Sequence, residues 1–155
     1  MNDITIADVG PQLVLGIRQV GNFQMIPSLI GRLCQFVDEK KISVAGPPLF
    51  LCHEKTEAEV KKANETSTAI IEVAIPVHQT VAEEGDIKLY ELPGGKMAKT
   101  IHRGPYENCK ITYDKIFAWL EKNNEKITAP IREVYLNDPA TVKPEEIITE
   151  IYVPI

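Results

Sequence analysis

The stretch "ITIADVGPQLVLGIRQVGNFQMIPSLIGRLCQFV", residues 4–37, has a counterpart later in the same chain. Placed over "IKLYELPGGKMAKTIHRGPYENCKITYDKIFAWL", residues 87–120, it needs no gap. The matched positions include Gly21 with Gly104, Phe23 with Tyr106, Leu33 with Ile116, and Phe36 with Trp119. Self-similarity over such a period indicates a duplicated structural unit.

The match continues beyond this stretch with a changed spacing. The aligned segments are residues 42–51 with 127–136, and residues 70–77 with 148–155. This alignment places Pro48 against Glu133. We therefore expect one domain over residues 1–155, with internal repeats at about 4–77 and 87–155.

Each copy has the pattern of a strand, a helix and two further strands. Apolar residues recur at helical spacing over residues 26–37 and again over residues 109–120. The β-branched segments that close the copies predict strands, with Pro76 and Pro154 at strand ends. The charged stretch "EKTEAEVKKANE", residues 54–65, is expected to be a solvated loop or a short helix.

Two such copies predict an α+β domain of tandem strand-helix-strand-strand units. One copy alone would leave an apolar sheet face bare, so the two should pack with pseudo-twofold symmetry into an antiparallel sheet with two main helices. The groove between the halves is a preferred place for a ligand.

Composition and charge narrow the class of function. The chain has 155 residues, of which 44% are apolar and 25% charged, as is ordinary for a globular domain. It has no apolar run near the roughly 18 residues of a membrane span and no secretory signal, so we expect a cytoplasmic protein. The net charge of −5 argues against direct nucleic-acid binding and favours a cationic partner.

The cysteines and histidines do not indicate a metal or a cofactor. Three cysteines form no CxxC pair, and the three histidines lie in separate segments without ligand spacing. Gly94 and Gly95, in "LPGGK", lack the spacing of a phosphate-binding loop and are interpreted as a turn or bulge.

Glu133 is the unusual residue of the second copy. It lies inside "PIREVYLNDP", residues 130–139, which reads as a strand closed by a turn. Arg132 should point to the opposite sheet face, so it cannot neutralise Glu133. Desolvation would raise the pKa of such a carboxylate, and a bound cation would lower it again. The alternative is an ordinary glutamate that is solvated or paired across the sheet.

The second copy also carries aromatic residues where the first copy has other side chains. The pairs are Tyr90 against Ala7, Tyr113 against Ile30, Tyr152 against Ala74, and Trp119 against Phe36. If they converge on Glu133, they form an aromatic pocket with a negative floor, which suits a hydrophobic or aromatic cation. The alternative interpretation makes Tyr113 and Trp119 core residues, Tyr135 a structural residue, and Glu72 and Glu150 solvated strand positions.

Four motifs of the second copy resemble a known family. They are "ELPGGKMAKTIHRGPYENC", "FAWLEKN", "REVYLNDP" and "EIYVPI". Their order and spacing resemble the effector-binding domains of AraC-type and multidrug-sensing bacterial regulators, the gyrase-inhibitor-like small-molecule-binding family. The resemblance implies paired units around a ligand cleft, in which Glu133 contacts cationic aromatic ligands. It also implies an aromatic cleft lining, for which Tyr90, Trp119 and Tyr152 are the candidates.

Three functions follow from these observations. Only three residues precede Ile4, which leaves no room for the DNA-binding region of related regulators, so we expect a stand-alone protein that sequesters a small molecule or reports it to another protein. The second hypothesis, which the family resemblance implies, is a hydrolase of reactive, strained small molecules, with Glu133 as general base and Tyr152 or Tyr90 as proton donor. The third is a protein-interaction module of gyrase-inhibitor type. No pattern in the sequence indicates the natural ligand or the oligomeric state.

Overall fold

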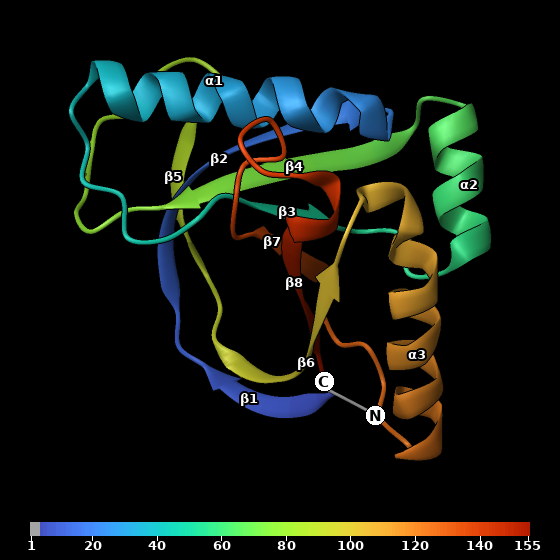
Figure 1. The fold of residues 1–155 in the computed structure, drawn as a ribbon. Helices are drawn as coiled ribbons and strands as arrows, with labels where there is room; N and C mark the ends of the chain where they lie inside the picture. Colours follow the sequence, from blue (N-terminus) through green and yellow to red (C-terminus); the bar gives the residue numbers. More distant parts are fainter. Residues whose placement is uncertain (1–3) are drawn as a thin grey trace.

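The computed structural model describes residues 4–155 and confirms the α+β prediction (Figure 1). Its strands are β1 (Thr5–Val9), β2 (Gln12–Gly21), β3 (Leu49–Cys52), β4 (Ala69–Pro76), β5 (Lys88–Leu92), β6 (Gly95–Arg103), β7 (Ile131–Tyr135) and β8 (Ile148–Pro154). Its α-helices are α1 (Ile26–Glu39), α2 (Glu57–Glu65) and α3 (Cys109–Lys122), and short 3-10 turns span Phe23–Met25, Tyr106–Asn108 and Pro144–Glu146. None of the helices in this part of the chain is long and apolar enough to cross a membrane.

All eight strands form one antiparallel sheet in the order β1-β6-β8-β7-β3-β4-β2-β5. The two copies meet at its centre, where β3 of the first copy pairs with β7 of the second. The outermost strands are exchanged, since β1 pairs with β6 and β5 pairs with β2. Each copy therefore begins with two strands rather than the single predicted one, because Pro11 and Pro93 have no N–H to continue a ladder.

The register of the sheet corrects one part of the sequence alignment. Ala74 lies opposite Leu49 in the first copy, and its equivalent, Tyr152, lies opposite Arg132 in the second. Leu49 is therefore the equivalent of Arg132, and Phe50 the equivalent of Glu133. The match of Pro48 with Glu133 is wrong by two residues, because the copies differ in length only after β3, where the first copy inserts α2.

The two main helices cover one face of the sheet. Helix α1 packs over β2 and β4, and α3 packs over β6, as Figure 1 shows for the blue and orange helices. Between α1 and the sheet, Leu29 and Leu33 of the helix pack against the strand residues Leu15, Ile17, Ile71 and Val73. Between α3 and the sheet, Ile116 and Leu120 of the helix pack against the strand residues Ala98, Ile151 and Val153. The opposite sheet face has a smaller apolar cluster of its own, formed by Val14, Leu49, Leu51, Ala74 and Leu92.

The curl of the sheet brings the β1–β2 and β5–β6 connections into backbone contact. A Cβ atom added to Gly94 would lie 2.4 Å from the carbonyl oxygen of Val9 and 2.8 Å from the carbonyl carbon of Gly10. Gly94 thus lies in the predicted turn between strands, whereas Gly95 already begins β6 and pairs with Val9. Gly94 is required there because only glycine permits this approach.

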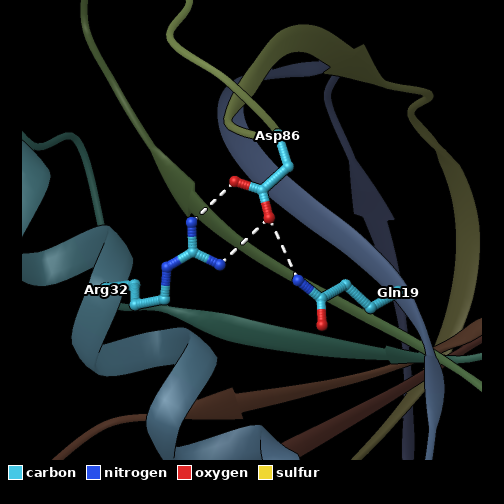
Figure 2. A network of polar contacts seen from close by, with 3 residues as sticks. All are labelled: Gln19, Arg32 and Asp86. Carbon is cyan, nitrogen blue, oxygen red and sulfur yellow. Dashed lines mark hydrogen bonds and ion pairs between the residues drawn. The ribbon is translucent and has the colours of Figure 1, made fainter.

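A polar network fastens the linker between the copies to the first half (Figure 2). Arg32 on α1 donates from both terminal nitrogens to Asp86, at 3.0 and 2.6 Å, and Gln19 on β2 donates to the same carboxylate at 3.0 Å. Hydrogen bonding from Arg32 lowers the pKa of Asp86 to about 2, although slight burial opposes the shift. These side chains are exposed, so the ion pair stabilises the fold by at most about 1 kcal/mol.

Substituting Gly94→Ala should lower the free energy of unfolding by about 1–3 kcal/mol, because the new methyl group overlaps the backbone of the β1–β2 connection. The matched control is Gly31→Ala in α1, where a Cβ meets nothing within 4 Å and helix propensity should add up to about 1 kcal/mol. Urea unfolding followed by circular dichroism measures both. A Gly94→Ala variant that is as stable as wild type, or more stable, would refute the close contact.

Candidate functional site

A cavity of about 370 Å³ lies against the central strand pair of the sheet, on the face that carries the helices. Its aromatic lining is formed by Phe23, Phe50, Tyr106, Tyr113 and Phe117, with Ile26, Val60 and Ile131 adding aliphatic surface. Both copies contribute to it, since Phe23 and Tyr106 are repeat equivalents, as are Phe50 and Glu133. The volume is within the usual range for small-molecule sites.

Glu133 lies in the wall of this cavity and is held by tyrosine hydroxyl groups. The hydroxyl of Tyr135 donates to Oε1 at 3.0 Å, and the hydroxyl of Tyr113 donates to Oε2. The hydroxyl groups of Tyr106 and Tyr135 are also 3.0 Å apart, which extends the chain of hydrogen bonds toward the cavity rim. Glu133 itself is only 6% exposed, so little water competes for its carboxyl group. The two hydrogen bonds from the tyrosines fix its orientation.

Burial dominates the electrostatics of Glu133. Desolvation raises the pKa of its carboxyl group to about 7, and the hydrogen bond from Tyr135 acts in the opposite direction. No ion pair among residues 4–155 includes Glu133. Arg132 points away from it and donates to the carbonyl oxygen of Pro93 at 2.6 Å, as strand alternation predicts. The cavity therefore holds an ionisable carboxyl group with tyrosine partners and no cationic partner.

The remaining polar groups of the cavity do not form a metal site. Burial, with the nearby charges of Glu133 and Glu54, raises the pKa of the Cys52 thiol to about 12, which keeps it protonated. Within the described part of the chain, no three His, Cys, Asp or Glu side chains are placed to hold a metal ion.

The rim of the cavity is formed by the start of α2 and the first turns of α3. Lys110 on α3 pairs with Asp114 at 2.9 Å and with Glu57 on α2 at 3.8 Å. Thr56 caps α2 by accepting the N–H of Glu59 at 3.1 Å. The acidic groups at this rim therefore already have a basic neighbour, unlike Glu133.

The structure brings together only part of the residues expected at the site. Glu133 and Tyr113 both line the cavity, whereas Tyr90, Trp119 and Tyr152 do not. The condition of their convergence on Glu133 is therefore not met in this cavity, whose aromatic wall is formed by other residues. Tyr152 lies opposite Arg132 and so belongs to the other sheet face, and Trp119 packs against the core beneath α3.

Tyr90 belongs to a polar cluster on the other sheet face. Its hydroxyl donates to Glu72 at 2.7 Å, and His53 contacts the second oxygen of that carboxylate at 2.6 Å. Glu72 is buried, which corrects its interpretation as a solvated position. Burial opposes its charge, yet the hydrogen bonds from His53 and Tyr90 hold its pKa below the usual value.

Tyr135 and Tyr106 are among the site residues that the sequence did not reveal, as are the lining residues Phe23, Phe50, Phe117 and Glu54. Tyr135 follows Glu133 by two positions in a strand, so strand alternation alone places both on the same face. The alignment of Tyr135 with Phe50 hid this signal by suggesting a structural role. Tyr106 lies in the 3-10 turn before α3, where no periodicity indicates its direction.

Comparison with known proteins identifies the family. The model of the GyrI-like small molecule binding domain matches residues 2–155. The chain belongs to this family. The resemblance seen in the four motifs is thereby confirmed, and the GyrI-like assignment agrees with the eight-stranded curled sheet and two main helices. No curated protein sequence matches the chain.

Solved structures share the fold of this GyrI-like domain. The EcmrR C-terminal domain is 23% identical, with a TM-score of 0.84 over 97% of this chain and 95% of that one. In the EcmrR–DNA complex, where the TM-score is 0.83, the domain spans only 56% of the EcmrR chain.

Two further structures show the range of proteins with this fold. SAV2435 bound to tetraphenylphosphonium is 17% identical, with a TM-score of 0.65 over 99% of this chain and 93% of that one. A hydrolase from Listeria innocua is 17% identical, with a TM-score of 0.62 over 98% and 91%. At these identities the likeness establishes the fold alone.

The raised pKa of Glu133 predicts how stability depends on pH. Its folded pKa of about 7 exceeds the ordinary value of 4.5, so the folded state binds more protons between these values. The free energy of unfolding should fall as pH rises through this window, by up to about 3 kcal/mol.

Glu133→Gln should remove this dependence and unfold at higher urea concentration than wild type at pH 8. Urea midpoints of both proteins at pH 5 and pH 8 measure it. A wild type whose pH dependence equals that of the variant would show that Glu133 titrates normally.

Proposed function

We propose that this domain binds hydrophobic aromatic cations in the cavity, with Glu133 as the counter-charge. The observation that carries the proposal is a buried, ionisable carboxyl group in an aromatic wall, held by tyrosines and in no ion pair with a basic side chain of residues 4–155. The ligand-bound SAV2435 structure supports it, because tetraphenylphosphonium is a ligand of this chemical class.

The aromatic lining supplies the rest of the affinity. A cation within about 6 Å of an aromatic ring centre gains about 0.5–2 kcal/mol from that ring. Ring edges, hydroxyl groups and one carboxylate adapt to ligands of different outline, because none of these contacts demands a single geometry. The lining therefore suits a class of cations rather than one compound.

The role that fits this binding is that of a sensor or a sequestering protein. Small-molecule binding is the property of the family. In EcmrR this fold is part of a longer chain whose structure was solved in complex with DNA. We propose that the occupied domain either holds its ligand away from other targets or reports it to a partner protein.

The direct test compares methyltriphenylphosphonium with triphenylphosphine oxide, its neutral near-isostere, by isothermal titration at pH 8. Wild type should bind the cation at least about tenfold more tightly, since one charge-assisted contact is worth roughly 1.5–3 kcal/mol. Glu133→Gln should abolish the preference. The matched control is Glu150→Gln, a strand glutamate paired with Lys99 outside the cavity, which should leave it unchanged.

The affinity for the cation should also depend on pH. Because the carboxyl group must ionise to act as counter-charge, binding should strengthen about tenfold from pH 6 to pH 8 and level off above. The neutral analogue and Glu133→Gln should show no such rise. Equal affinity for cation and neutral analogue at pH 8 would refute the proposed function.

The same carboxyl group supports a second candidate function, hydrolysis of a reactive, strained small molecule. A group with a pKa near 7 suits general acid-base catalysis, and the hydroxyl groups of Tyr113 and Tyr135 contact it. These hydroxyls replace Tyr90 and Tyr152 as candidate proton donors, since the latter lie outside the cavity.

Hydrolysis is tested by incubating the protein with an aryl epoxide and following diol formation by mass spectrometry. A hydrolase should show multiple turnovers that Glu133→Gln abolishes and Glu150→Gln preserves. Product formation at the rate of buffer alone would exclude this activity toward epoxides and leave binding as the function.

A further inference from the structure

A second carboxylate, that of Glu54, lies in the wall of the same cavity. It continues the alternation of β3, in which Phe50 and Cys52 face the cavity. The intervening residue, His53, contacts Glu72 on the other sheet face. Glu54 is therefore aligned with the cavity by the strand that precedes it.

The side chain of Glu54 is incompletely paired. Its Oε2 accepts a long hydrogen bond, 3.3 Å, from the N–H of Ile70. Its Oε1 is buried and has no hydrogen-bond partner among residues 4–155. Buried carboxylate oxygens are normally satisfied, so an unpaired one in a cavity wall calls for a partner.

The other charged groups of the wall differ from Glu54. Glu57 and Asp114 both pair with Lys110 at the rim. Lys55 is the second basic residue of the lining and is exposed. The wall thus carries four carboxylates against two ammonium groups, and only Glu54 and Glu133 have no basic side chain in contact.

The β3–β7 pair and the two residues that follow β3 set the separation of these two carboxylates. Glu133 lies directly opposite Phe50, and Glu54 follows Phe50 by four residues. Glu54 lies two residues beyond the end of β3, so a chain that stays extended and advances about 3.3 Å per residue would place the two backbone positions roughly 13 Å apart. Allowing for side chains, a ligand that contacts both needs positive groups on the order of 10 Å apart.

We propose that the cavity is built for an elongated ligand with two positive groups, one at Glu133 and the other, an N–H donor, at Glu54. This inference rests on the proposed binding of aromatic cations and names the finer class, dicationic amines. An ammonium or amidinium group would supply the partner that Glu54 Oε1 lacks, once a rotation of the side chain brings this buried oxygen to the cavity surface. A ligand with an acidic second group would meet the net negative wall and be disfavoured.

The test uses two probes with one skeleton, hexyltriphenylphosphonium and (6-aminohexyl)triphenylphosphonium. They differ only in a terminal ammonium group, which the chain places about as far from the phosphorus as the proposal requires. Isothermal titration gives both dissociation constants for wild type, Glu54→Gln, Glu133→Gln and the matched control Glu57→Gln. The readout is the ratio of the two constants in each protein, which forms a double-mutant cycle.

Glu54→Gln should weaken the ammonium probe by about tenfold or more relative to the hexyl probe, the effect of one hydrogen bond to a charged group. Binding of the hexyl probe should stay unchanged, which also shows that the variant is folded. Glu57→Gln should leave the ratio as in wild type, because Glu57 already shares Lys110 with Asp114. Glu133→Gln should weaken both probes.

The outcomes separate this inference from the proposed function. If both probes bind wild type and Glu54→Gln leaves their ratio unchanged, the second anchor is refuted while cation binding stands. A ratio that changes equally in Glu54→Gln and Glu57→Gln also refutes it, since the effect is then general surface charge. If neither probe binds wild type, the proposed function itself fails.

Discussion

The burial of one carboxyl group at the centre of the sheet is the constraint around which the site is arranged. Glu133 sits on the central strand pair, beneath the helices, where charge is disfavoured and its pKa rises to about 7. The two tyrosine hydroxyls that contact it reduce this cost but do not remove it. A carboxyl group kept in this state gains most from a partner that brings both a positive charge and apolar surface into the cavity.

Duplication explains why there is one such site and not two. The pseudo-twofold relation makes Phe50 the equivalent of Glu133, and the two face each other across the β3–β7 pair. Two glutamates at these positions would repel each other in a buried place, and two phenylalanines would leave no counter-charge. The mixed pair supplies an aromatic surface from one copy and a carboxylate from the other. The single insertion, α2, then closes the side of the cavity that belongs to the first copy.

The repeat pattern predicted the fold class, the helices and the symmetry because these depend on periodic apolar residues. The site was predicted less well, since it depends on register. A two-residue error in the alignment placed Pro48 against Glu133, and it hid both Phe50 and the hydroxyl of Tyr135. Tyr90, Trp119 and Tyr152 were singled out because they differ between the copies, but such a difference does not say on which face a residue lies.

The opposite sheet face explains how the fold tolerates a costly residue at its centre. There, Arg132 on β7 donates to the carbonyl oxygen of Pro93, which follows β5. Glu72 on β4 accepts a hydrogen bond from Tyr90 on β5 and contacts His53, so side chains link β5 to the centre of the sheet. The exchanged edge strands join the two copies into one ladder, so neither half closes without the other. This support fixes β7, which carries Glu133, and β3, which ends two residues before Glu54, independently of the cavity's contents. A ligand can then add charge compensation to a preformed site, because the chain holds the two carboxylates apart before it arrives.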